Sequence, residues 1–428
     1  MKYWSALSLL VLLSFSLQAQ EEAPAVTPAL MGEIAAIENN LQPGIQIEGE
    51  ETPTYRLTER MAHYQVPGIS IAVIKDGELR WAKGYGLANT ATDAPVTSET
   101  LFQAGSISKP VAALAVLKLA EEGKVDLDED VNVYLKDWQI PENPYTATEK
   151  VTLRRILTHS AGMTVHGFPG YAQTDDFPTD IEVLNGEGNT PAIVVDTIPG
   201  TLCRYSGGGY TVMERVVENV TGLRFQDYMD RVILQPLRMY SSTYAQPLPE
   251  RWHSRASAAY DRQGEMIEGL WHNYPEQAAA GLWTTPSDLA RYLLAMQATL
   301  AGKTDGLLTP ATVEEMLSRH EACQRGLGPM VKGEGDDLLF GHGGKNAGFT
   351  NNMIAYAHHG DGVIVMTSGD NGWPLIEEIT LAVASHYGWG LAKPRIIKPV
   401  EVPVEELATL TGRYLFEEQI PGIGDYYV

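Results

Sequence analysis

Cysteine and positive charge are both scarce in this chain of 428 residues. Its two cysteines, Cys203 and Cys323, lie outside any C-x-x-C pattern, which argues against thiol catalysis. The chain holds 31 lysines and arginines against 54 acidic residues, and its net charge of −23 repels nucleic acid and anionic lipid surfaces. The sequence leaves open whether the two cysteines are joined in a bridge.

The short motifs that mark metal and cofactor sites are also missing. Neither an H-E-x-x-H pattern nor a glycine-rich phosphate loop of the right spacing occurs. We therefore expect no metal and no cofactor. After the first residues, no apolar run is long enough to cross a bilayer, so we expect no stable membrane insertion.

Residues 1–19 are typical of a secretory signal peptide. Lys2 supplies the positive start, residues 7–17 form an apolar stretch, and Ala19 is a plausible cleavage point. The alternative is an uncleaved membrane anchor, although about eleven apolar-rich residues are too few for a permanent membrane span. We expect an exported protein, either periplasmic or secreted.

The composition divides the remaining chain into three parts. Residues 20–54 are mostly polar and contain several Glu and Pro, as in a leader into the fold. Residues 55–390 are long and apolar enough to form one large domain or two ordinary ones, and we expect one large domain. Residues 391–428 are expected to form a linker and a short tail, which is too small to make a core of its own.

Strand patterns cluster at both ends of the large domain. Residues 69–86 alternate around an Asp-Gly pair, and residues 352–367 form a second predicted hairpin. Residues 375–387 have the pattern of an amphipathic helix, and the polar stretch 166–199 is expected to border the site. These patterns predict an α+β fold: an antiparallel β-sheet flanked by helices, plus a mostly helical lobe.

The segment 102–109, F-Q-A-G-S-I-S-K, contains a serine and a lysine three residues apart. If Ser106 opens a helix, Lys109 lies one turn along on the same face, where its amine can activate the hydroxyl. Pro110 suits a first helical turn, and residues 111–120 suit a helix buried on all sides. The alternative is that Ser106 is only a helix cap and Lys109 a solvated surface residue.

Two further segments offer partners for this pair. Tyr205 precedes a glycine run, and a phenol near a lysine ammonium could accept the serine proton. His342 stands in F-G-H-G-G-K-N-A-G-F, where glycines could present backbone N–H groups to a carbonyl oxygen. Taken singly, each residue is better explained as structural, the tyrosine buried in a turn and the histidine in the core.

Together and in this order, S-x-x-K, Y-S-G and H-G-G resemble the serine β-lactamase-related hydrolases, of the class C β-lactamase, DD-peptidase and esterase type. Three more segments resemble elements of that family. They are L-T-H-S-A-G-M at 157–163, L-Q-P-L-R-M at 234–239 and A-A-G-L-W-T-T-P-S-D-L-A at 279–290. The resemblance runs from about residue 55 to 390 and implies the fold predicted above.

The resemblance also implies roles for single residues. Ser106 matches the acylated nucleophile, Lys109 the lysine that tunes it, and Tyr205 the tyrosine that passes protons to the leaving group. His342 matches the polar residue that orients the tyrosine or the substrate. The backbone N–H groups of Ser106 and Lys345 would form the oxyanion hole.

Substrate contacts are expected from the glycines and the amide beside these residues, namely Gly207, Gly343, Gly344 and Asn346. Two positions depart from the family pattern. Gly207 stands where β-lactamases have an asparagine that contacts a substrate amide, so strong β-lactam turnover is doubtful. His342 stands where lysine is common, and a histidine is mostly neutral at pH 7, which makes an essential substrate carboxylate less certain.

The sequence thus predicts an exported serine hydrolase that forms an acyl-enzyme on a small-molecule or peptide substrate with an amide, lactam or ester carbonyl. The alternatives are a carboxylesterase and a penicillin-binding receptor without turnover. Glu276 precedes the alanine-rich segment, and we expect it to be a solvated surface residue rather than part of the site. The oligomeric state and the substrate stay open.

Overall fold

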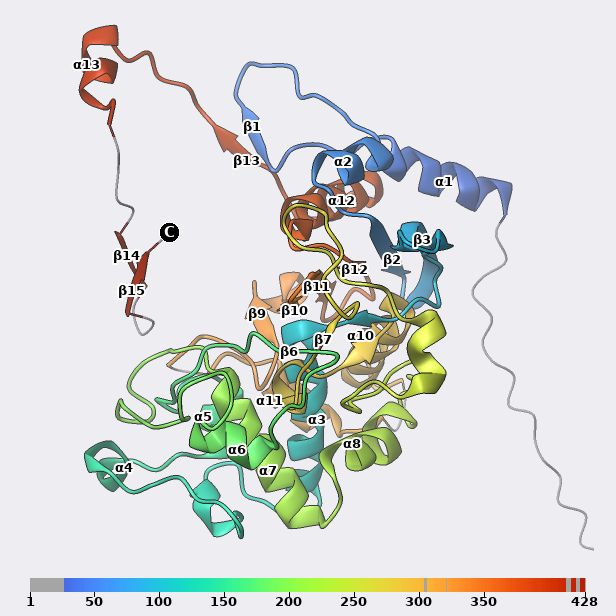
Figure 1. Ribbon diagram of the computed structural model, residues 1–428. Helices are drawn as coiled ribbons and strands as arrows, with labels where there is room; N and C mark the ends of the chain where they lie inside the picture. The colour runs from blue at the N-terminus through green and yellow to red at the C-terminus, as the bar shows by residue number, and fades with distance from the viewer. Residues whose placement is uncertain (1–26, 304–305, 321, 413–416, 421–423, 428) are drawn as a thin grey trace, which may run out of the picture.

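The computed structural model describes residues 27–303, 306–320 and 322–412, and the backbone of 417–420 and 424–427. The signal peptide expected at 1–19 lies outside these residues. The largest element is an antiparallel sheet of seven strands (Figure 1). In spatial order these are β4 (Ala94–Pro95), β3 (Glu78–Asn89), β2 (Gly68–Lys75), β12 (Gly362–Thr367), β11 (Phe349–Tyr356), β10 (Leu339–Asn346) and β9 (Met330–Lys332).

Both predicted hairpins are confirmed. β2 and β3 meet at an Asp-Gly turn in which Asp76 and Gly77 have φ of 55° and 81°, the backbone that a tight hairpin requires. β11 pairs with β12, and β12 pairs with β2, so Ile69 lies opposite Thr367. Strands from the two ends of the domain therefore share the centre of one sheet.

The sheet separates two hydrophobic cores, because successive side chains of a strand point to opposite faces. On β2, Ile71 and Val73 belong to one core and Ala72 and Ile74 to the other. The first core lies under α1 (Pro28–Glu38), α2 (Leu57–His63) and α12 (Gly372–Tyr387), seen above the sheet in Figure 1. The helix predicted at 375–387 is confirmed as part of α12.

The larger core lies on the other face of the sheet and is enclosed mostly by helices (Figure 1). They are α3 (Ser108–Glu121), α4 (Pro144–Thr148), α5 (Leu153–Leu157), α6 (Asp180–Asn185), α7 (Gly207–Thr221), α8 (Phe225–Tyr228), α9 (Gln277–Ala280), α10 (Pro286–Leu300) and α11 (Pro310–Met316). This arrangement confirms the predicted α+β class with a mostly helical lobe. Short pairs complete it: β5 (Phe102–Gln103) with β8 (Trp283–Thr284), and β6 (Tyr171–Ala172) with β7 (His272–Asn273).

The helix α3 runs through this lobe and carries the predicted S-x-x-K segment into it. Every residue from 108 to 117 is buried, in keeping with the apolar run predicted for a central helix. Its position is fixed from the side of β8, because Leu282 donates its N–H to Ser108 Oγ at 3.0 Å. This hydrogen bond joins the start of α3 to the residue before β8.

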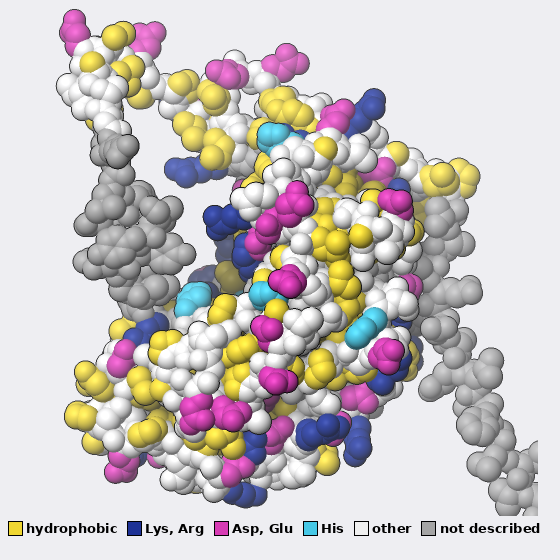
Figure 2. All heavy atoms as spheres, in the orientation of Figure 1, with side chains coloured by type: hydrophobic (Ala, Val, Ile, Leu, Met, Phe, Trp, Pro, Cys, Tyr) yellow, Lys and Arg dark blue, Asp and Glu magenta, His cyan; other side chains and the backbone are white. Residues whose placement is uncertain are grey.

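Residues 20–54, expected to be a leader, include a helix that belongs to the fold. Leu30, Ile34 and Ile37 of α1 are buried against α12 and the sheet. Nearby, β1 (Ile45–Ile47) pairs in parallel with β13 (Arg395–Ile397) from the expected linker. The apolar side chains of this small pair are largely exposed, and they are visible at the top of Figure 2.

The last described helix, α13 (Val404–Thr409), has no buried residue. The hairpin β14 (Glu417–Ile420) and β15 (Gly424–Tyr427) follows it. Acidic side chains are spread over the face drawn in Figure 2 rather than gathered in one patch. Within the described ranges, none of the helices is both long and apolar enough to cross a membrane.

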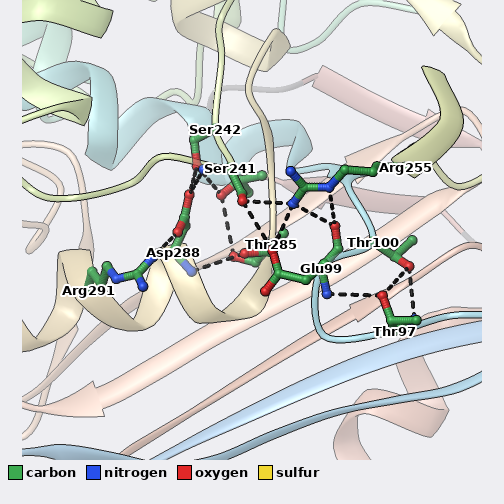
Figure 3. Close-up of polar contacts among 10 residues, drawn as sticks. Thr97, Glu99, Thr100, Ser241, Ser242, Arg255, Thr285, Asp288 and Arg291 are labelled. Atoms are coloured by element: carbon green, nitrogen blue, oxygen red, sulfur yellow. Dashed lines mark hydrogen bonds and ion pairs between the residues drawn. The ribbon is translucent and has the colours of Figure 1, made fainter. Parts of the chain in front are cut away.

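A polar network ties the segment before β5 to the start of α10 (Figure 3). Asp288 is 1 % exposed and accepts hydrogen bonds from the Ser241 N–H and the Ser242 hydroxyl, both at 2.7 Å. Arg255 donates to the backbone oxygen of Glu99 at 2.9 Å and to Ser241 Oγ at 2.7 Å. The network therefore fixes the segment around Glu99, which leads into β5 and the S-x-x-K segment.

Candidate active site

Ser106 lies in a single 3₁₀ turn, Gly105–Ile107, directly before α3. It does not open the α-helix itself, as the spacing suggested, but the turn leads without a break into Ser108. Gly105 has φ of 55°, and a Cβ there would lie 2.5 Å from the backbone nitrogen of Lys345. Only glycine allows this approach, which places Ser106 beside the backbone of β10.

Lys109 reaches back to the serine from the first turn of α3. Its Nζ donates to Ser106 Oγ at 3.0 Å and to the backbone oxygen of Ala279 at 2.9 Å. The side chain is 2 % exposed, and among the described carboxylates none forms an ion pair with it. The amine is therefore directed at the hydroxyl by the fold, so the interpretation of Lys109 as a surface residue is wrong.

Tyr205 lies on the other side of this amine. Lys109 Nζ is 5.0 Å from the centroid of its ring, within the range of a cation–π contact. The ring is tilted over His159, with centroids 4.0 Å apart, and His166 lies at 4.8 Å. The buried Tyr205 hydroxyl has no hydrogen-bond partner among the described residues.

The approach of His166 confirms that the polar stretch 166–199 borders the site. The same stretch explains the glycine at 207. A Cβ on Gly207 would lie 2.9 Å from Phe168 Cε2 and 3.1 Å from the backbone oxygen of His166. The space that an asparagine side chain would need here is filled by this loop.

The strand β10 presents alternate residues to the site. A Cβ on Gly344 would lie 1.9 Å from the backbone oxygen of Ala104, so this position faces the turn that carries Ser106. A Cβ on Gly343 would instead meet the ring of Trp373 at 3.1 Å, on the opposite face. The side chain of Lys345 also turns away, since its Nζ donates to the backbone oxygen of Asp370 at 3.1 Å.

The side chain of Asn346 lies on the same face of β10 as Gly344, but its hydrogen bonds are to other parts of the protein. Its amide Nδ2 donates to Gln103 Oε1 at 3.0 Å and to the backbone oxygen of Ala280 at 3.1 Å. The side chain is 4 % exposed. These bonds join β10 to β5 and α9, the two elements next to Ser106 and Lys109.

His342 is a neutral group in this site. Burial lowers the pKa of His342 to about 3, and the charges of Lys109 and Arg325 act in the same direction. Its Nδ1 donates to the backbone oxygen of Gly343, which leaves Nε2 as an acceptor that has no partner among the described residues. The ring centroid lies 6.1 Å from that of Tyr205. The direction of this pKa shift favours the uncharged form that the sequence led us to expect for His342.

Residues 56–386, most of the chain, match the family model described as Beta-lactamase. The chain belongs to the Beta-lactamase family. The resemblance of the three motifs to this family is thereby confirmed, and the chain has the β-lactamase fold.

Two relatives of this Beta-lactamase-family chain share less than a third of its residues over the matched region. Protein flp of Staphylococcus aureus is 26 % identical over 241 residues, which cover 53 % of this chain and 45 % of the relative. The unguisins hydrolase ungD of Aspergillus violaceofuscus is 29 % identical over 253 residues, which cover 56 % and 43 %. The chain thus matches less than half the length of these two relatives.

Solved structures match a larger share of the chain than these two relatives do. The octameric penicillin-binding protein homologue from Pyrococcus abyssi has a TM-score of 0.66 at 27 % identity, over 79 % of this chain and 77 % of that one. SurE, solved with D-Leu, has a TM-score of 0.62 at 23 % identity, over 80 % and 76 %, and shows the fold alone.

Glu276 corrects an expectation from the sequence. It is fully buried rather than solvated, and both of its carboxylate oxygens lack partners among the described residues. Burial raises the pKa of Glu276 to about 8. It precedes α9, whose Ala279 accepts from Lys109 and whose Ala278 donates to the buried Glu214 at 2.8 Å. Burial therefore favours the protonated form of this carboxyl group, which lies behind the site.

Arg325 lies at the site although it stands outside the motifs quoted in the sequence analysis. Its guanidinium carbon is 5.5 Å from the centroid of the Tyr205 ring. A disulfide bridge joins Cys203 and Cys323, with Cα atoms 4.7 Å apart, and so connects the two segments. The sequence left this pairing open and so gave no signal for Arg325. Each cysteine stands two residues before one of the two side chains, Tyr205 or Arg325.

Proposed function

We propose that this Beta-lactamase-family hydrolase is an exported serine hydrolase that forms an acyl-enzyme on Ser106. One observation carries the proposal: Lys109 Nζ lies 3.0 Å from Ser106 Oγ inside a buried frame. The nearby Tyr205 hydroxyl is unpartnered among the described residues, so the serine proton has two groups that can receive or relay it.

In the first step, Ser106 Oγ attacks the substrate carbonyl carbon. Its proton passes to the Lys109 and Tyr205 pair, and the carbonyl oxygen gains negative charge beside the backbone N–H groups of Ser106 and Lys345. The bond to the leaving group then breaks, and the leaving group takes the proton through Tyr205. In the second step, water adds to the acyl carbon, gives up a proton to the same pair, and Ser106 is released with its proton restored.

Within this reaction class, the site favours esters over β-lactams. The loop with Phe168 takes the place of the asparagine side chain that would contact a substrate amide. A simple ester does not need this asparagine, because it has no amide group with which the side chain could form a hydrogen bond. We therefore expect slow or no turnover of a cephalosporin.

A panel of three substrates tests the proposal: p-nitrophenyl acetate, a chromogenic cephalosporin and a D-alanyl peptide. We expect turnover of at least the ester, and loss of that turnover in Ser106→Ala. Mass spectrometry should find the acyl group on a peptide that contains Ser106. Full activity in Ser106→Ala would refute the assigned nucleophile. A β-lactam that stays bound to Ser106, without turnover of any substrate, would favour a receptor.

The exported location is supported by the signal-like residues 1–19 and by the bridge between Cys203 and Cys323, since disulfides persist in oxidising compartments. Fractionation of expressing bacteria, with N-terminal sequencing of the product, tests it. We expect a processed chain outside the cytoplasm that begins near residue 20. An unprocessed chain in the cytoplasmic fraction would contradict export.

A further inference from the structure

His159 is the buried histidine of the L-T-H-S-A-G-M segment, and its ring lies against that of Tyr205. The residue is 2 % exposed, and the two ring centroids are 4.0 Å apart with 31° between the ring planes. The Tyr205 hydroxyl has no hydrogen-bond partner among the described residues, so no such bond fixes its position. The place of this phenol therefore depends on the backbone of its segment and on the packing of its ring.

His159 also binds the backbone on both sides of Tyr205. The Arg204 N–H donates to the backbone oxygen of His159 at 2.9 Å. The Ser206 N–H donates to the ring atom Nδ1 of His159 at 3.2 Å. One residue thus accepts a hydrogen bond from each neighbour of the tyrosine and packs on the ring between them, so a change in His159 is expected to move the phenol.

The backbone of His159 has a conformation that is usually taken by glycine. The helix α5 ends in a Schellman motif, in which the His159 N–H donates to the backbone oxygen of Ile156 at 3.1 Å. The helices α3 and α10 end in the same motif, and the left-handed residues there are Gly123 and Gly302, with φ of 67° and 63°. His159 has φ of 59°. A side chain at such a position has a steric cost that glycine avoids.

The imidazole of His159 has a second cost. Because the Ser206 N–H donates to Nδ1, the neutral ring carries its hydrogen on Nε2, and this buried atom has no partner among the described residues. Burial lowers the pKa of His159 well below its usual value, and the charges of Arg325 and Lys109 act in the same direction. A buried donor without a partner lowers stability. Costs of this kind are typical of residues that a functional site requires.

We propose that His159 is a positioning residue that holds the Tyr205 phenol in place for proton transfer between Ser106 and the leaving group. The proposal rests on the serine hydrolase function. During acylation the Ser106 proton moves to the pair of Lys109 and Tyr205, and Tyr205 passes a proton to the leaving oxygen as its bond to the carbonyl carbon breaks. His159 neither gives nor takes a proton, since its Nδ1 accepts from the Ser206 N–H throughout.

Two variants keep the backbone conformation and remove the side chain in steps. His159→Asn suits a left-handed position and keeps an acceptor for the Ser206 N–H, whereas His159→Gly removes both the acceptor and the ring. We expect kcat/KM for ester hydrolysis to fall about 10-fold to 100-fold in His159→Gly, mainly through kcat, and less in His159→Asn. His253→Asn is the matched control, because His253 also contacts a backbone oxygen, that of Leu248 at 2.9 Å, and packs against Trp271 instead of the tyrosine. This control should change less than about 2-fold.

The leaving group shows whether the loss passes through Tyr205. p-Nitrophenolate departs with little help from a proton, whereas the more basic phenolate of phenyl acetate needs it. We therefore expect kcat/KM of His159→Gly to fall at least about 3-fold further for phenyl acetate than for p-nitrophenyl acetate. Equal losses on the two esters would overturn the proposal, and so would full activity of His159→Gly.

A double-mutant cycle isolates the coupling between the two residues. Tyr205→Phe keeps the ring and removes the hydroxyl, so adding His159→Gly to it should cause less than about 3-fold further loss. Fully additive losses would mean that His159 acts through another group, which overturns the proposal. Denaturant unfolding checks that each variant is folded, and if His159→Gly is not, His159→Asn serves in the same comparisons.

The same assays separate this inference from the function on which it rests. If the wild type hydrolyses both esters, Ser106→Ala hydrolyses neither and the His159 variants match the wild type, only the role of His159 is refuted. If the wild type hydrolyses neither ester, or Ser106→Ala keeps its activity, the serine hydrolase function fails and the role of His159 falls with it.

Discussion

Glu276 is the residue whose chemistry the fold changes most. Its carboxyl group is fully buried, and its two oxygens have no partner among the described residues. A carboxylate in such surroundings loses its hydration without compensation, and the neutral acid is favoured. The pKa of Glu276 therefore rises from 4.5 to about 8.

This shift predicts a pH dependence of stability. Between about pH 4.5 and pH 8 the folded state keeps a proton on Glu276 that the unfolded state has lost. This group's contribution to the free energy of unfolding is therefore complete below about pH 4.5 and decreases steadily as the pH rises to about 8. The loss is at most about 1.4 kcal/mol per pH unit. Glu276→Gln cannot ionise, and denaturant unfolding from pH 5 to 8 should show its stability rising steadily relative to the wild type.

The exposed Glu268 provides the control for this measurement. Glu268→Gln should follow the wild type at every pH, because its side chain is hydrated in both states. If Glu276→Gln also runs parallel to the wild type between pH 5 and 8, the carboxyl is ionised in the folded protein. The assignment of a buried neutral acid behind the site would then be wrong.

At the scale of elements, the decisive contact is that between β10 and the turn carrying Ser106. Gly344 faces this turn so closely that a Cβ would overlap the backbone oxygen of Ala104 at 1.9 Å. A backbone atom cannot move aside without moving the whole turn. The Lys345 N–H lies one residue further along and depends on the same approach.

Gly344→Ala is therefore expected to push β10 away from the turn and to remove the Lys345 N–H from the reacting oxygen. Loss of one oxyanion donor lowers the rate about 100-fold to 1000-fold, and we expect a fall in kcat/KM of that size in ester hydrolysis. Gly343→Ala is the matched control. Its Cβ meets the ring of the half-exposed Trp373 at 3.1 Å, and this ring can shift.

The control should lose less than about 3-fold in the same assay, and thermal unfolding should show both variants folded. If the two variants had equal activities, the assignment of Gly344 to the face of β10 that meets the Ser106 turn would be contradicted. This result would also remove the support for the Lys345 N–H as an oxyanion donor.

These elements differ in how far the sequence could predict them. The two hairpins and α3 follow from local signals: an Asp-Gly turn, period-two alternation and an apolar run behind Pro110. The spacing of Ser106 and Lys109 on one turn likewise needs no distant contact. The sequence showed that Gly207 replaces the asparagine of the family pattern. It could not show the reason, because the ring of Phe168 that fills the space belongs to a separate loop.

At the scale of the whole molecule, α1 joins the first hydrophobic core although its segment was expected to be a leader. Leu30, Ile34 and Ile37 are each less than 10 % exposed, and they pack with residues of α12 and β2. The helix begins with a cap at Thr27, whose hydroxyl accepts from the Leu30 N–H at 3.2 Å. The first hydrophobic core, which α1 covers together with α2 and α12, is therefore incomplete without this helix.

We expect Ile37→Ala to lower the free energy of unfolding by about 2–5 kcal/mol, the usual cost of truncating a buried isoleucine. Met31→Ala on the same helix should change it by less than about 0.5 kcal/mol, because Met31 is 59 % exposed. Urea denaturation measures both. If Ile37→Ala unfolds with the midpoint of the wild type, α1 is not docked in solution and the segment behaves as a leader.

The sequence by itself determined the features that depend on neighbours along the chain: the hairpins, the central helix, the S-x-x-K pair and the family they indicate. Only the tertiary structure decided the buried state of Glu276, the docking of α1 and the place of Arg325 beside Tyr205. The physical reason is that periodicity and turn chemistry act over a few residues. Burial, ionisation and steric exclusion instead depend on which distant segments the fold brings into contact.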